Sequence, residues 1–225
     1  MTSTPQAPPT TPTSPGQALS ASLESETMSV VASVGDTALD AVVRSGALDG
    51  LPIFSVAVGL FKAQREVRDH LYAKKVVGLL HGVGSATTQA ERDSFVAGLR
   101  AKGQAERFGE TVLLLLEQAD DARKPDLMGR ILAAHMSGKI AAYADAMRLI
   151  AMINRAYAVD LNHLITMKPG VQRGHGALIA ASLESVGLLV NGGFDGGGFD
   201  EDAEPGGLIY HISDYGRLLL THGLV

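Results

Sequence analysis

The sequence predicts a mainly α-helical protein, an irregular helical bundle followed by a small α+β module with one β-hairpin. Three observations predict this fold class. Apolar residues recur at helical spacing from Met28 onward, no stretch between Met28 and residue 170 resembles a strand, and a short β-like run follows a glycine-rich segment near the C-terminus. Hydrophobic residues make up 46% of the 225 residues, which is enough to build a sizeable core.

Composition and charge exclude several classes of protein. The formal charge of −5 gives no general attraction to the phosphates of a nucleic acid. The absence of cysteine excludes disulfides, thiolate metal sites and cysteine nucleophiles. The N-terminus does not have the pattern of a secretory signal, and the longest apolar stretch, 51–61, is far shorter than the roughly 20 residues that span a bilayer. We therefore expect a cytoplasmic protein.

The first 26 residues are rich in proline, serine and threonine. They hold five of the nine prolines and no aromatic residue. Such a composition buries too little apolar surface to offset the entropy of ordering the backbone. The sequence therefore predicts that residues 1–26 form a disordered tail.

Residues 27–156 are predicted to form the helical domain. A first helix follows Met28, and a long helical stretch begins at Pro52 and ends at the glycines of 82–84. Thr88 and Glu91 have the spacing of a capping box, which predicts that the next helix begins there.

Further sequence signals predict the helices in the second half of this domain. The uninterrupted apolar run 112–116 predicts a central helix that is buried on all sides. Pro125 is predicted to lie in the first turn of the following helix, which runs to about Gly138. One or two more helices are expected over 141–167, before the break at Pro169-Gly170.

The segment 157–225 has a different character. A short helix over 176–186 is followed by Gly187-Leu188-Leu189, then by a glycine-rich acidic segment and the β-like run 208–212. Ser213 is predicted to cap a last helix that contains Gly216-Arg217-Leu218-Leu219. This order resembles the second half of a winged helix. In that family a hairpin wing lies between a helix that ends in a small-Leu-Leu strand and a return strand that leads into the last helix. The resemblance implies a small α+β module of the kind that binds DNA or another protein.

The charge of this module argues against DNA. The wing segment, Asn191–Gly206, contains five carboxylates and no lysine or arginine, and a polyanion would repel it. The DNA-binding residues of the family therefore do not carry over. The candidate interaction residues of the module are Asp195, Asp200, Glu201, Asp202 and Tyr210.

A second candidate surface lies in the segment 51–75, where an apolar stretch precedes a basic cluster. Such a pattern is typical of a helix that lies in a membrane interface, although a buried helix with a solvated end explains it more simply. The candidate residues for a membrane or partner surface are Phe54, Phe61, Lys62, Arg65 and Arg68.

No catalytic, cofactor-binding or metal-ligating motif is recognisable. The seven histidines include no pair at helical i, i+4 spacing, and His135 is interpreted as a core or boundary residue. The acidic wing is interpreted as solvated, with calcium binding as the alternative. The sequence therefore predicts a non-enzymatic interaction or regulatory protein without cofactors, which binds a protein partner through the C-terminal module. A membrane-surface effector and a DNA-binding regulator are the alternatives, and a homo-oligomer remains open.

Overall fold

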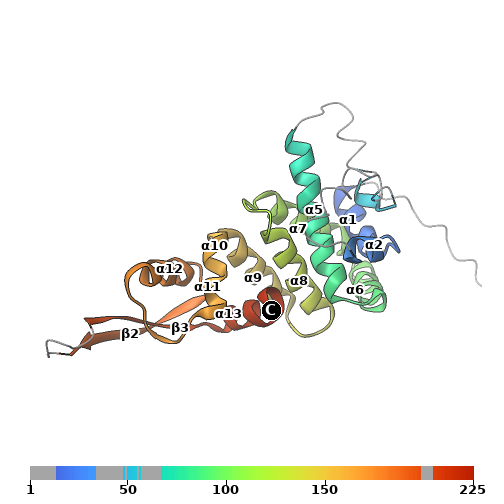
Figure 1. Cartoon of the computed structure of the whole chain (residues 1–225). Helices are drawn as coiled ribbons and strands as arrows, with labels where there is room; N and C mark the ends of the chain where they lie inside the picture. The colour runs from blue at the N-terminus through green and yellow to red at the C-terminus, as the bar shows by residue number, and fades with distance from the viewer. Residues whose placement is uncertain (1–13, 34–47, 49, 55, 57–66, 199–204) are drawn as a thin grey trace, which may run out of the picture.

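The computed structural model describes residues 14–33, 48, 50–54, 56, 67–198 and 205–225. It is mostly helical, with one three-stranded antiparallel sheet near the C-terminus, so the predicted fold class is confirmed. The sheet and its helices project from one side of the bundle (Figure 1). Among the described residues, no helix combines the length and apolarity needed to cross a membrane.

The bundle begins with a helix that the sequence analysis did not predict. The prediction of a disordered tail is wrong for residues 15–26, because α1 (Pro15–Leu23) lies in the core, while residues 1–13 lie outside the described part. Ser14 accepts a hydrogen bond from the Gln17 N–H, and Pro15 occupies the first turn. Leu19 and Leu23 are buried, and these two leucines anchor the segment in the core. Its proline content had led to the prediction of disorder.

The centre of the bundle is a pair of helices, α5 (Val67–Ala86) and α8 (Lys124–Met136). A Cβ on Gly82 would lie 2.1 Å from the Asp126 carbonyl oxygen, and one on Gly129 would lie 2.2 Å from the Leu79 carbonyl oxygen. The prediction that the glycines of 82–84 end the helix is therefore wrong. Glycine at 82 lets α8 approach closely, and the helix continues to Ala86.

The other helices cover this pair. α2 (Met28–Ser33) packs on α5, and α1 packs on α7 (Ala105–Glu117). The predicted capping box is confirmed at the start of α6 (Gln89–Ala101). The interpretation of 112–116 as buried on all sides is wrong, because Leu114 is exposed on the outer side of α7. The predicted position of Pro125 in the first turn of α8 is confirmed.

After α9 (Tyr143–Arg155), the chain forms two single-turn helices, α10 (Ala158–Leu161) and α11 (His163–Thr166), so 141–167 contains three helices instead of one or two. The module continues with β1 (Gly170–Val171), α12 (Gly174–Ser185), β2 (Leu189–Gly197) and β3 (Pro205–Ile212). The sheet order is β1-β3-β2. Ser213 caps α13 (Asp214–Leu219), as predicted, and a π-helical turn η2 (Leu220–Leu224) follows.

One hydrophobic core runs through both the bundle and the C-terminal module. It extends from Leu19 in α1 through Ile131 in α8 to Tyr210 in β3 and Leu219 in α13. The last turn, η2, packs back on α8. Residues 157–225 are therefore joined to the preceding helices by buried side chains as well as by the chain itself.

Candidate protein-binding surface

Strands β2 and β3 form an arm that extends away from the helices (Figure 1). Their register pairs Leu189 with Ile212 at the base and Phe194 with Leu208 further out, with a bulge between Asn191 and Gly193. Gly206 has to be a glycine, because a Cβ there would lie 2.0 Å from the Asp195 carbonyl oxygen. Glycine at position 206 thus allows the two strands to approach each other closely.

The inner face of this sheet continues beyond the helices that cover it. Tyr210 is 1% exposed, and Leu208, two residues away on the same face of β3, is 44% exposed. Phe194 lies directly opposite Leu208 and is 71% exposed. Cross-strand partners have their side chains on the same face, so Phe194 and Leu208 form an uncovered apolar pair. We call this pair the arm patch.

Helix α12 of the same module presents a second uncharged surface. Leu178 is 69% exposed, and Ala181 and Ser185, one and two turns further along the helix, are also exposed. None of these three residues is charged. A helix with small and apolar residues on its outer side suits contact with a protein rather than with phosphates.

Two predicted interaction residues of the module lie within the described part. Asp195 is exposed on β2, and its carboxylate accepts a hydrogen bond from the Gly197 N–H at 3.0 Å. Tyr210, by contrast, is buried in the core, so its prediction as a surface contact is wrong. Its position in β3 places its ring on the covered part of the inner face. Asp200, Glu201 and Asp202 lie outside the described residues.

The predicted membrane or partner surface is only partly described. Leu51 and Ile53 are buried, and Phe54 is partly buried and packs against the core. The start of this apolar stretch therefore belongs to the bundle. Phe61, Lys62 and Arg65 lie outside the described residues; Arg68 lies in α5, with its side chain outside the described part.

The structure agrees with the interpretation of His135 as a boundary residue. Its Nδ1 lies 2.8 Å from the Ile140 carbonyl oxygen, and its ring packs edge-on against Phe95. Among the described residues, no group of three or more histidine, aspartate or glutamate side chains is arranged to hold a metal ion.

The arm patch was missed by the sequence analysis, which weighed the charges of the wing rather than its apolar residues. A signal was present. Leu208, Tyr210 and Ile212 alternate with period two, and Phe194 is isolated among glycines and carboxylates. The strand register, which sequence reasoning could not supply, sets Phe194 opposite Leu208.

No protein-family model matches the chain, and no match was found among curated proteins or solved structures. The resemblance of the C-terminal module to a winged helix therefore stays a prediction. The order of elements in the module differs from that of a helix-turn-helix. A helix-turn-helix joins its recognition helix to a preceding helix by a short turn, whereas β1 lies between α11 and α12 in this chain.

Proposed function

We propose that this chain is a non-enzymatic, cytoplasmic interaction or regulatory protein that binds a protein partner through its C-terminal module. The observation that supports the proposal is the arm patch, an apolar continuation of the sheet's inner face with no cover from the described residues. Phenylalanine and leucine side chains that are left in water in this way gain free energy when a partner covers them. Aromatic residues of this kind are common at the centre of protein interfaces.

The charge of the module supports a protein over a nucleic acid. Asn191–Gly206 has no lysine or arginine, and Glu184 is the one charged residue of α12 besides the titratable His175. Phosphate contacts supply most of the affinity of DNA-binding proteins, and they require basic side chains. Binding to a membrane through 51–61 is supported less, because Leu51 and Ile53 lie in the core.

The test is partner capture with the full-length protein carrying Phe194→Asp and Leu208→Asp. A charge at each position should prevent a partner from covering the arm patch, because burying an unpaired carboxylate is costly. We expect quantitative mass spectrometry to show at least one protein that is enriched on the native chain and lost on the double variant. Light scattering with native and variant protein would show whether the partner is a second copy of the chain.

The matched control is Leu114→Asp, which changes an exposed leucine of α7 in the helical bundle. We expect this variant to retain the same partners, since Leu114 is not part of the C-terminal module. Recovery of an identical set of proteins by the double variant and the native chain, with both folded by circular dichroism, would contradict the proposal.

A further inference from the structure

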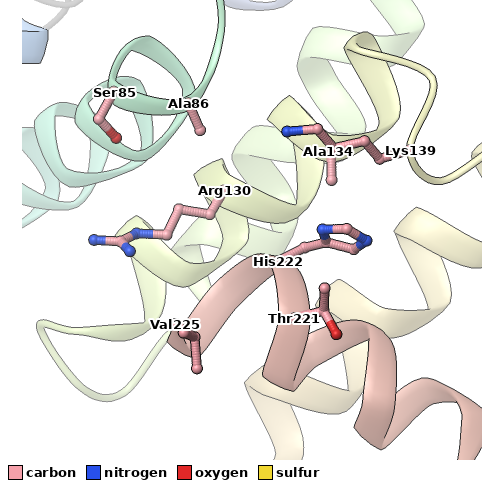
Figure 2. Close-up of a pocket in the computed structure, with 8 residues that line it drawn as sticks. All are labelled: Ser85, Ala86, Arg130, Ala134, Lys139, Thr221, His222 and Val225. Atoms are coloured by element: carbon pink, nitrogen blue, oxygen red, sulfur yellow. The ribbon is translucent and has the colours of Figure 1, made fainter.

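A pocket between the end of α5, helix α8 and the C-terminal turn η2 is lined by positive side chains that do not converge on one point. Figure 2 shows the guanidinium of Arg130 pointing away from Lys139 and His222. Arg130 Nε also donates to Asp126 Oδ2 at 2.8 Å, so its charge already has a partner within α8. A reactive side chain that its neighbours hold in place is found instead in the arm formed by β2 and β3.

Asn191 begins an Asn-Gly-Gly sequence on the exposed part of β2. A glycine after asparagine favours reaction of the asparagine side chain with the next main-chain nitrogen. No Cβ shields that nitrogen, and the main chain of glycine reaches conformations that other residues avoid. The sequence has two other asparagines, Asn154 and Asn162, which precede Arg155 and His163. Asn191 is therefore the one asparagine of the chain that precedes a glycine.

The structure turns the side chain of Asn191 toward the main chain that follows it. Its Oδ1 accepts a hydrogen bond from the Gly193 N–H at 2.8 Å. The ring that this hydrogen bond closes contains both Cγ of Asn191 and the nitrogen of Gly192. A donor on Oδ1 also stabilises the negative charge that develops on this oxygen when a nucleophile attacks Cγ. The hydrogen bond thus prepares Cγ for attack by the Gly192 nitrogen.

The register of the two strands is irregular at this point. Asn191 pairs with Tyr210 and Gly193 pairs with Ile209, so Gly192 has no register partner in β3. Gly193 has a φ of 121°, which glycine adopts without strain. Asn191 and Gly192 are both exposed, so water has access to them. The bulge therefore leaves the attacking residue outside the regular ladder.

We propose that Asn191 is a site of spontaneous deamidation. The nitrogen of Gly192 gives its proton to water and attacks Cγ of Asn191, and the bond from Cγ to Nδ2 breaks. Nδ2 takes up a proton and leaves as ammonia, and a five-membered succinimide ring remains. Water then opens this ring at either of its carbonyl carbons. Opening at Cγ gives aspartate and opening at the main-chain carbon gives isoaspartate, so the net reaction consumes water and releases ammonia.

Both products change the arm close to the arm patch. Each replaces a neutral amide by a carboxylate on the same face of the sheet as Phe194. Isoaspartate also lengthens the main chain by a methylene group, just before the bulge after which Phe194 lies opposite Leu208. Deamidation should therefore weaken partner binding through the arm patch. This consequence rests on the proposed function, whereas the reaction at Asn191 does not.

The test is incubation of the full-length protein at neutral and mildly alkaline pH, followed by mass spectrometry of the peptide that contains Asn191. We expect the mass change that replaces an amide NH₂ by OH, with aspartate and isoaspartate separated by chromatography. Gly192→Ala should slow the conversion by about tenfold, because a Cβ hinders the attack and restricts the main chain. That Cβ would lie 2.5 Å from His211 Nε2, so circular dichroism should verify that the variant is folded.

Two comparisons separate the effect of the structure from that of exposure or sequence. Asn162 is also exposed but precedes His163, so it should stay intact while Asn191 is converted. The chain unfolded in urea keeps the Asn-Gly sequence but loses the hydrogen bond from Gly193, so the folded protein should react faster. The proposal is overturned if the folded protein reacts more slowly than the unfolded chain, or if Asn162 and Asn191 react at the same rate.

Discussion

At the scale of single residues, Lys124 is the clearest case of a charge that the fold has to accommodate. Its side chain is 0% exposed, and its ammonium donates to Asp120 Oδ1 at 2.5 Å and to the Asn154 carbonyl oxygen at 2.7 Å. The Asn154 side chain in turn donates to the Leu115 carbonyl oxygen. A buried ammonium without such partners would strongly destabilise the protein, so this network ties α7, α8 and α9 together.

Asp120→Ala should lower the free energy of unfolding by about 1 kcal/mol at pH 7. The lost hydrogen bond involves two charged groups, but the Asp120 carboxylate is 70% exposed and solvent screens its contribution. Asp214→Ala breaks an exposed ion pair with Arg217 and should change stability by less than about 0.5 kcal/mol. Urea denaturation measures the free energy of unfolding of both variants. Equal effects of the two substitutions would contradict a stabilising role of the Asp120–Lys124 hydrogen bond.

The contribution of Asp120 should also depend on pH. The hydrogen bond from Lys124 holds the pKa of Asp120 below its ordinary value. A carboxylate with a lowered folded-state pKa stabilises the protein above its unfolded-state pKa of about 3.9, and this stability is lost as the pH falls through the folded-state value. The difference between the native chain and Asp120→Ala should therefore shrink as the pH is lowered from 5 toward 2.

At the scale of elements, the crossing of α5 and α8 depends on glycine in a way that is specific to position. Gly129→Ala should destabilise the protein by about 2 kcal/mol, because a Cβ at 2.2 Å from the Leu79 carbonyl oxygen forces the two helices apart. The higher helix propensity of alanine offsets only part of this cost.

Gly98→Ala in α6 is the matched control for this substitution. A Cβ there meets nothing within 4 Å, so only the propensity gain remains, and stability should rise by about 0.5–1 kcal/mol. Denaturant midpoints of the two variants should therefore move in opposite directions. A shift of Gly129→Ala to higher denaturant would show that the helices do not cross as described.

At the scale of the whole molecule, the bundle and the C-terminal module share one core. Leu219→Ala in α13 should cost about 2–4 kcal/mol, because Leu219 is fully buried. Since η2 packs on α8, we expect hydrogen exchange to accelerate in α8 as well as in β3. Phe194→Ala, which changes an exposed residue of the arm, should leave exchange in α8 unchanged. Faster exchange confined to residues 157–225 would mean that the module unfolds independently.

Sequence reasoning predicted the elements whose signals are local. The capping box at Thr88, the first-turn Pro125 and the N-cap Ser213 are each decided by hydrogen bonds or sterics within a few residues. It was wrong about α1, because the composition of 1–26 does not reveal that this helix packs on α7, far away in the chain, and that Leu19 and Leu23 are buried. It was also wrong about Gly82, whose role depends on a neighbouring helix.

By itself, the sequence determined the helical class, the C-terminal sheet and a module whose wing lacks basic residues, since all three follow from spacing and composition. The tertiary structure alone decided that Tyr210 is buried while Leu208 and Phe194 are not, and that the buried ammonium of Lys124 donates to the carbonyl oxygen of Asn154 in α9. The physical reason is the same for both. Burial, and the partners of a buried charge, depend on which distant segments pack together. The periodicity of one segment does not show which other segments pack against it.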